Sequence, residues 1–114
     1  MSELPDAGDL VWLNFDPQAG HEQAGHRPAL VLSPRIYHEK TVLAIVCPIT
    51  SNRKPYPFKV MLPHGLPIGG AVLADQVKSI DRAARRLDIA GQAPRSVLVE
   101  TRARLAALLS LDPG

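Results

Sequence analysis

Apolar and polar residues alternate along the first two thirds of the chain, and this period of two is typical of β-strands with one buried face. Residues 41–48 are almost entirely apolar, which predicts a central strand covered on both faces. A loop of ten residues, 17–26, separates the first two strands, and loops of this length often carry function. The predicted strands cover residues 9–16, 28–33, 41–48, 58–62, 71–74 and 77–80.

The period changes near the C-terminus, where Val97, Thr101, Leu105 and Leu108 recur at helical spacing. Pro94 fits the first turn of this predicted helix. A run of short strands followed by one helix argues against a βαβ fold. The pattern therefore predicts a mostly β protein, a small antiparallel barrel with a C-terminal α-helix packed on it.

Length and composition predict one domain spanning residues 1–114 with an aliphatic core, since only 4% of the residues are aromatic. The formal net charge of +2 permits nucleic-acid binding without requiring it. Basic residues cluster in two places, which are candidate phosphate contacts or simply solvated faces. The clusters are Arg53, Lys54 and Lys59, and Arg82, Arg85 and Arg86.

Several classes of protein find no support in the sequence. Cys47, the single cysteine, allows no intrachain disulfide and lies in an apolar run, so we expect an inert buried thiol. We see neither a signal peptide nor an apolar stretch approaching the roughly 20 residues that span a membrane, and expect a cytoplasmic protein without a membrane partner. No nucleotide-binding glycine motif or zinc motif occurs, and His21 and His26 lack further ligands, so no metal or cofactor is expected.

The most unusual segment is Gly20–Pro28, which places titratable side chains in a glycine-punctuated loop that leads directly into an apolar strand. Arg27 can grip a phosphate with two parallel hydrogen bonds. Glu22 could accept a proton, and His21 titrates near neutral pH. Thr50 follows the third strand and would lie near Arg27 if the second and third strands pair.

Asp75 and Gln76 interrupt an apolar segment, where a carboxylate and an amide could face a ligand. Together with the loop residues they suit metal-free proton transfer and anion stabilisation. A ribonuclease that uses the RNA 2′-hydroxyl as nucleophile needs a base, a cation for the phosphate and an acid for the leaving oxygen. The same residues also have structural interpretations: an ion pair of Arg27 with Asp75 or Asp81, a solvated Glu22, a packing role for His26, a backbone bond for Thr50 and a turn cap for Asp75.

Four motifs in order give the chain a family resemblance: Gly8–Trp12 opening the first strand, Asp16-Pro17 ending it, E-Q-x-G-x-R-P within residues 20–28, and D-Q-x-x-x-I-D within residues 71–81. From about Gly8 to the C-terminal helix, the chain resembles the MazF/PemK (Kid) toxins of bacterial toxin–antitoxin modules. The resemblance implies a compact barrel related to SH3-like and CcdB-like folds, and a homodimer.

The resemblance also implies a metal-independent endoribonuclease, an mRNA interferase that cuts single-stranded RNA and leaves a 2′,3′-cyclic phosphate and a 5′-hydroxyl. It implies a cognate antitoxin whose acidic, disordered tail covers the RNA groove. By position, the catalytic residues of the family fall on Arg27, Thr50 and Glu22. The expected RNA-binding residues are Gln23, His26, Ser51, Asn52, Arg53, Lys54, Lys78, Arg82, Arg85 and Arg86.

The chain departs from the Kid-like branch at one point. His21 matches a histidine of that branch, but its Arg–Cys–Asp triplet is Leu73-Ala74-Asp75 here, and Leu73 cannot carry a proton. We therefore expect the acid–base chemistry in the Glu22 and Arg27 loop. His21, Asp75 and Gln76 are then expected to be either catalytic or RNA-binding, with Asp75 holding RNA or orienting Arg27.

Two other functions are compatible with such a barrel. One is a CcdB-like toxin that binds a protein target such as gyrase and has no ribonuclease activity. The other is an RNA-binding module without catalysis. The co-occurrence of Glu22, Arg27 and Thr50 favours the ribonuclease over both.

Overall fold

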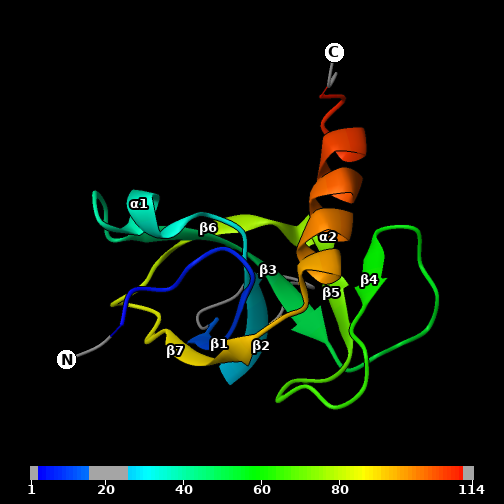
Figure 1. The fold of residues 1–114 in the computed structure, drawn as a ribbon, viewed down its shortest axis with the longest axis horizontal. Helices are drawn as coiled ribbons and strands as arrows, with labels where there is room; N and C mark the ends of the chain where they lie inside the picture. The colour runs from blue at the N-terminus through cyan, green and yellow to red at the C-terminus, as the bar shows by residue number, and fades with distance from the viewer. Residues whose placement is uncertain (1–2, 16–25, 112–114) are drawn as a thin grey trace.

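The computed structural model describes residues 3–15 and 26–111, which form an antiparallel sheet, a short helix and a longer C-terminal helix (Figure 1). The strands are β1 (Asp9–Asn14), β2 (His26–Val31), β3 (Leu43–Thr50), β4 (Lys59–Met61), β5 (Ala71–Leu73), β6 (Lys78–Asp81) and β7 (Asp88–Gln92). The helices are α1 (Arg35–His38), the 3₁₀ helix η1 (Ala74–Gln76) and α2 (Arg95–Leu108).

The sheet has the order β4-β5-β3-β2-β1-β7, and β6 pairs with β3 beside this path. Each of these pairs is antiparallel. Within the part of the chain that the structure describes, no pairing joins β4 to β7, so the sheet curls like a barrel but stays open. The predicted fold class, mostly antiparallel β with a C-terminal helix, is confirmed in this open form.

Strand β3 is the centre of the sheet because three other strands pair along its length. Its first half pairs with β6, its middle with β2 and its last two residues with β5. The predicted central position is confirmed, but the predicted cover on both faces is wrong for the first half. Leu43 and Ile45 are 37% and 36% exposed, because they project from the face opposite to that of the buried Ala44 and Val46.

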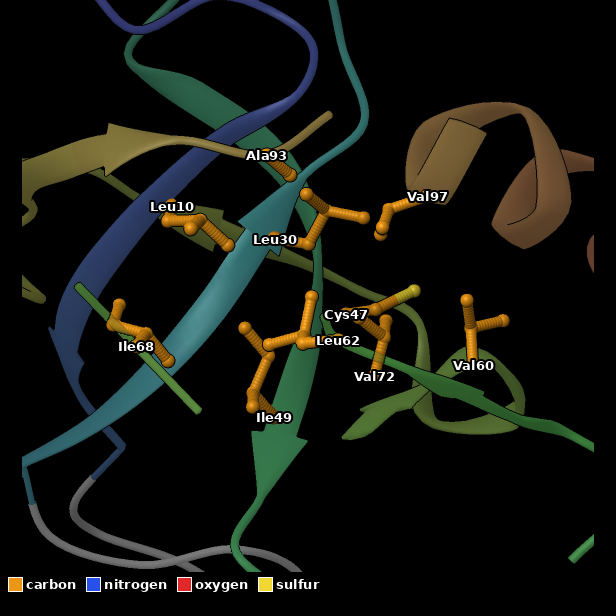
Figure 2. Close-up of a cluster of buried hydrophobic side chains, with 10 residues drawn as sticks. All are labelled: Leu10, Leu30, Cys47, Ile49, Val60, Leu62, Ile68, Val72, Ala93 and Val97. Carbon is orange, nitrogen blue, oxygen red and sulfur yellow. The ribbon is translucent and has the colours of Figure 1, made fainter. Parts of the chain in front are cut away.

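Two buried clusters fill the two faces of the curled sheet. The first lies between the sheet and α2 (Figure 2) and contains Leu10, Leu30, Cys47, Ile49, Val60, Leu62, Ile68, Val72, Ala93 and Val97. The second contains Val11, Leu13, Phe15, Ala29, Val31, Ala44, Val46 and Ile80. Alternate residues of β1, β2 and β3 enter alternate clusters, as the period of two predicted. The aliphatic core predicted from composition is confirmed.

Cys47 belongs to the first cluster and is fully buried, as expected for a structural thiol. Burial, followed by the charge of Asp75, raises the pKa of this thiol to about 12. The thiolate is therefore disfavoured at neutral pH, and nucleophilic chemistry at Cys47 is not expected.

Helix α2 confirms the predicted C-terminal helix and stands on the side of the sheet formed by β3, β5 and β4 (Figure 1). Arg104 donates through Nη2 to Glu100 Oε1 at 3.2 Å, the expected pair one turn apart. Its Nη1 donates to the carbonyl oxygen of Pro57 at 2.7 Å, which ties α2 to the segment between β3 and β4. None of the described helices is both long and apolar enough to cross a membrane.

The sequence pattern missed three short elements, which are α1, η1 and β7. Strand β7 has polar residues at both ends and Gly91 within it, so its amphipathic signal is weak. It is held by pairing with β1, a contact remote in sequence. His26, expected in the loop, and Thr50, expected in a turn, are strand residues, which fixes their side-chain directions.

Candidate active site

Arg27 and Thr50 come from neighbouring strands that run antiparallel. The register of β2 and β3 pairs Ala29 with Pro48, Leu30 with Cys47 and Val31 with Val46. The ladder ends at Ala29 and Pro48, and a continuation of its register by two residues would bring Arg27 opposite Thr50. Their expected proximity depended on the pairing of the second and third strands, and this pairing is confirmed.

The alternation of side chains puts Arg27 and Thr50 on the same face of the sheet. Arg27 shares a face of β2 with Ala29, two residues along, and Thr50 shares a face of β3 with Val46, four residues back. Ala29 and Val46 both belong to the second cluster. Arg27 is exposed and Thr50 is half-buried. A guanidinium and a hydroxyl therefore project from the end of this face, next to the point where residues 16–25 connect β1 with β2.

Lys78 adds a second cation to the same face. It pairs with Val46 across β3 and β6, and its Nζ lies 5.1 Å from the ring centre of Phe15. This cation–π contact holds the ammonium group over the edge of the second cluster. Two cations and a hydroxyl on one face can hold an anion such as a phosphodiester.

His26 points to the other face of β2. Its ring lies 5.2 Å from that of Trp12, which packs against the first cluster. The structure therefore favours the packing interpretation of His26 and does not bring its side chain to the face of Arg27. The expectation that His26 binds RNA stays a prediction.

The backbone of Thr50 is held by close packing. Thr50 pairs with Ala71, and Gly70 lies so close that a Cβ there would collide with the Thr50 carbonyl oxygen. The N–H of Asn52 donates to Thr50 Oγ1 at 3.2 Å, which is the local backbone bond considered from the sequence. This bond uses a lone pair of the oxygen and not the hydroxyl hydrogen, which can still donate.

After the end of β3, residues of the segment 52–59 together with Leu73 and η1 line an open hollow of about 330 Å³. Its lining residues are Asn52, Lys54, Pro55, Tyr56, Lys59, Leu73, Asp75 and Gln76. The hydroxyl of Tyr56 donates to Asp75 Oδ2 at 2.7 Å. This hydrogen bond, and then the negative charge of Asp75, raises the pKa of Tyr56 above its ordinary value. The structure thus brings Asn52, Lys54, Asp75 and Gln76 together, all predicted from the sequence.

Arg53 and Lys59 hold the segment 51–58 in place rather than extending freely from it. Arg53 Nη1 donates to the carbonyl oxygens of Leu62 and Gly70 at 3.2 and 2.9 Å. Lys59 Nζ donates to those of Asn52 and Lys54 at 2.9 and 2.8 Å. These bonds favour a positioning role for Arg53, while Ser51, Asn52 and Lys54 remain exposed.

The second basic cluster begins with Arg82 at the other end of β3. Asp81, which precedes Arg82, pairs with Leu43, seven residues along β3 from Thr50, or about 23 Å in an extended strand. Arg82 Nη2 donates to the carbonyl oxygens of His38 and Thr41 at 2.9 and 2.6 Å. Arg82 is therefore remote from Thr50, whereas the carbonyl oxygen of Arg85 accepts a hydrogen bond from the N–H of Asn14 at 2.8 Å. Asn14 lies at the end of β1, where Leu13 and Asn14 pair with Arg27 and His26.

The hydrogen bonds of Asp81 and Asp75 bear on the structural interpretations of these two residues. Asp81 accepts hydrogen bonds from the N–H groups of Ala83 and Ala84, both at 3.0 Å, and so stabilises its own turn. Among the described residues, no side-chain hydrogen bond caps η1, and Asp75 Oδ2 accepts a hydrogen bond from the hydroxyl of Tyr56. The predicted residues His21, Glu22 and Gln23 lie outside the described residues.

The described residues contain no group of three or more His, Cys, Asp or Glu side chains placed to hold a metal ion. The contributions that sequence reasoning missed come from Tyr56 and Gly70. An aromatic residue flanked by Pro55 and Pro57 in a polar segment was the available signal for Tyr56. The role of Gly70 had no local signal, because its constraint comes from Thr50, twenty residues earlier.

Comparisons with known proteins agree over nearly the whole chain. Residues 6–109 match the family described as PemK-like, MazF-like toxin of type II toxin-antitoxin system. Over 82 residues, 72% of this chain and 73% of the relative, the chain is 55% identical to the endoribonuclease toxin MazF of Escherichia coli K12. The gyrase-binding alternative finds no support in these comparisons.

Solved structures give the same result. The crystal structure of MazF from Deinococcus radiodurans superposes with a TM-score of 0.92 at 54% identity, covering 96% of this chain and 100% of that one. A chain from a crystal structure of MazE–MazF of the same organism superposes with a TM-score of 0.88 at 53% identity, covering 97% and 100%.

Proposed function

Because the chain belongs to the PemK-like, MazF-like toxin family of type II toxin–antitoxin systems, we propose that it is an endoribonuclease that cuts single-stranded messenger RNA in the cytoplasm. The observation that carries the proposal is the placement of Arg27 and Thr50 at one end of the same sheet face. The names of the relatives, endoribonuclease toxin MazF among them, support the reaction class.

In the proposed reaction the 2′-oxygen of a nucleotide attacks the adjacent phosphorus, and the bond from phosphorus to the 5′-oxygen breaks. The products are a 2′,3′-cyclic phosphate and a 5′-hydroxyl. A base takes the proton of the 2′-hydroxyl, and a proton is delivered to the leaving 5′-oxygen. We assign this acid–base work to the loop residues Glu22 and His21, which lie outside the described residues.

The described residues supply the electrostatic part of the reaction. Negative charge builds on the non-bridging oxygens as the 2′-oxygen attacks, and the guanidinium of Arg27 can donate two parallel hydrogen bonds to them. The hydroxyl of Thr50 can donate to the same phosphate from the neighbouring strand. In this scheme the protein's own cation, rather than a metal ion, stabilises the transition state.

The proposed RNA path continues from Thr50 along the segment after β3. Ser51, Asn52 and Lys54 are exposed there, and Gln76 lies across the hollow. Lys78 reaches the same face as Arg27. For Gln23, Arg82, Arg85 and Arg86, RNA contact stays a prediction from the sequence.

We further propose a cognate antitoxin with an acidic, disordered tail. The MazE–MazF complex of Deinococcus radiodurans shows that a relative binds its antitoxin. Carboxylates of an acidic tail would bind the same cations as RNA phosphates, and a tail that folds on binding can wrap a large surface.

A homodimer completes the proposal. Exposed apolar side chains collect in two places on the described surface, and such patches mark interaction sites. One comprises Ile36 on α1 and Val42 just before β3, which are 62% and 57% exposed. The other is the end of α2, with Leu109 59% and Leu111 60% exposed.

The chemistry is tested with purified protein and a mixed-sequence RNA in excess EDTA. We expect cleavage, fragments with cyclic phosphate and 5′-hydroxyl ends, and no cleavage at a site that carries a 2′-O-methyl group. A requirement for Mg²⁺, or cleavage beside a 2′-O-methyl group, would contradict the proposed reaction. Sequencing the 5′ ends of the fragments would also give the cleavage sequence.

A further inference from the structure

The segment 51–58 joins the end of β3 at Thr50 to the start of β4 at Lys59, and Figure 1 shows it as a wide loop at the edge of the molecule. None of its residues belongs to a strand or a helix. A connection of this kind is expected to move more than the strands beside it, unless side chains hold it. Because the segment begins directly after Thr50, the contacts that hold its first residues also hold the chain that leaves Thr50.

Arg53 ties the first part of this segment to the neighbouring strands. Its Nη1 donates to the carbonyl oxygens of Leu62 and Gly70 at 3.2 and 2.9 Å. The N–H of Leu62 donates to the same Gly70 oxygen at 2.9 Å, so the guanidinium joins a contact that the backbone already makes. Hydrogen bonds with a charged donor are stronger than those between neutral groups. Arg53 therefore fixes the segment to the residues that follow β4 and precede β5.

Gly70 is also the residue that packs against Thr50. A Cβ at position 70 would collide with the carbonyl oxygen of Thr50, and the next residue, Ala71, pairs with Thr50 across β3 and β5. The chain from Thr50 to Arg53, together with the bond from Arg53 back to Gly70, thus forms a closed ring. A ring this small leaves the backbone little freedom to change direction after Thr50.

Asn52 connects this ring to the hydroxyl of Thr50. Its N–H donates to Thr50 Oγ1 at 3.2 Å. The side-chain rotamer of Thr50 therefore depends on the position of the Asn52 backbone, and Asn52 immediately precedes Arg53. The N–H occupies a lone pair of Oγ1 and leaves the hydroxyl hydrogen able to donate to a phosphate.

We propose that Arg53 is a positioning residue, which holds the hydroxyl of Thr50 toward the scissile phosphate and acts through Thr50 rather than by binding the RNA itself. The inference rests on the proposed function. A donor that is already oriented before the RNA binds needs no reorganisation when charge develops on the phosphate, and such donors lower the barrier most.

The test is a double-mutant cycle of Arg53→Met and Thr50→Val, measured as kcat and KM on a fluorogenic RNA in EDTA. Met keeps the unbranched stem of Arg53 without its donors, and Val keeps the shape of Thr50 without its hydroxyl. Arg53→Lys retains a cationic donor. The matched control is Lys54→Met, which removes the next cation of the segment, an exposed residue on the proposed RNA path. Thermal unfolding checks that every variant is folded.

We expect Arg53→Met to lower kcat about 10- to 100-fold with little change in KM, because a displacement of about 1 Å at a reacting group can cost two orders of magnitude. In the Thr50→Val background the same substitution should change kcat by less than about threefold, since the group that Arg53 positions is already absent. Arg53→Lys should recover most of the lost kcat.

Lys54→Met should behave differently, because it removes a phosphate contact. We expect it to raise KM, to weaken the salt dependence of RNA binding, and to multiply with the effect of Thr50→Val.

A second measurement needs no catalysis. Hydrogen exchange of the Asn52 amide, which is bonded to Thr50 Oγ1, should be faster in Arg53→Met than in wild type and unchanged in Lys54→Met.

Equal losses from Arg53→Met in the wild-type and Thr50→Val backgrounds would show that Arg53 acts independently of Thr50. This result would overturn the inference and leave the ribonuclease proposal intact. An Asn52 amide that exchanges at the wild-type rate in Arg53→Met, or Arg53→Lys no more active than Arg53→Met, would overturn the inference as well. Wild-type protein that cuts no RNA would refute the proposed reaction, and the inference with it.

Discussion

Tyr56 and Asp75 show how a single hydrogen bond can shape the candidate site at the residue scale. The two residues lie nineteen positions apart in the sequence, and their bond links the segment after β3 to η1. The phenol donates, so the bond exists only while Tyr56 is protonated. Ionised Tyr56 would place a phenolate against the carboxylate of Asp75, which is why the pKa of Tyr56 is raised.

Titration of Tyr56 is the first prediction. Its pKa should lie above the ordinary value of 10.0. A pKa raised in the folded state means that the bond contributes stability below pH 10 or so, and that this contribution is lost as the pH rises through the raised pKa. The Tyr37→Phe variant leaves Tyr56 as the only tyrosine, so tyrosinate absorbance reports it alone. Adding Asp75→Asn should lower the midpoint, and an unchanged midpoint would contradict the assigned cause.

The sequence predicted best the positions of residues whose environment is set by their own strand. Thr50, which follows the predicted third strand, was expected near Arg27 if the second and third strands pair, and these strands do pair. Sequence reasoning could not find Tyr56, because the carboxylate that anchors its hydroxyl comes from a remote segment. It also counted Arg53 among the RNA-binding residues, whereas its Nη1 donates to two carbonyl oxygens that are remote in sequence.

At the scale of elements, the junction of β3 and β5 fixes the backbone of Thr50. Gly70 has a φ of +117° and lies against the Thr50 carbonyl group, so a larger residue there would be strained and would collide. Gly65 has a φ of +90° but open space around its Cβ position, and Gly69 has open space without a positive φ. The chain thus offers three nearby glycines that separate backbone strain from collision.

The second prediction uses these three glycines. Gly70→Ala should lower the free energy of unfolding by about 2–4 kcal/mol, since it combines strain with collision. Gly65→Ala should cost about 1–2 kcal/mol through strain alone. Gly69→Ala should stay within about 0.5 kcal/mol of wild type. Urea unfolding measures all three, and equal losses for Gly70→Ala and Gly69→Ala would contradict the close approach to Thr50.

The elements that the sequence predicted are those with a strong period, such as β1, β2 and α2. Strand β7 was missed because its five residues lack a strong apolar pattern of their own and form a strand by pairing with β1. Thr50 was assigned to a turn because its polarity breaks the apolar run of β3. The ladder with Ala71 nevertheless extends the strand to include it.

At the scale of the whole molecule, the open sheet leaves two unpaired ends among the described strands, and apolar side chains remain exposed at α1, at the start of β3 and at the end of α2. The apolar pattern predicted a barrel with a helix, but not where the sheet stays open, since closure depends on pairings between remote strands. A second copy of the chain would cover such surfaces, in keeping with the proposed homodimer.

The third prediction concerns this assembly. Light scattering at micromolar concentration should give twice the chain mass of 12.3 kDa. Ile36→Lys and Leu109→Lys each place a charge in one of the two apolar patches, and at least one should shift the mass toward the monomer. A wild-type protein that stays monomeric would refute the homodimer.

The central claim is that the end of the sheet carrying Arg27 and Thr50 cleaves RNA, and cleavage by Arg27 variants tests it most directly. In EDTA, wild-type protein should cut a fluorogenic RNA. Arg27→Ala should be slower by on the order of 10²–10³, because one charged contact to the transition state is lost. Arg27→Lys should also fail, since an ammonium group cannot make the two parallel bonds. Arg102→Ala removes an exposed arginine of α2 to which no RNA contact is assigned, and should retain activity within a few fold. Folded Arg27→Ala that cuts RNA within a few fold of wild type would contradict the account.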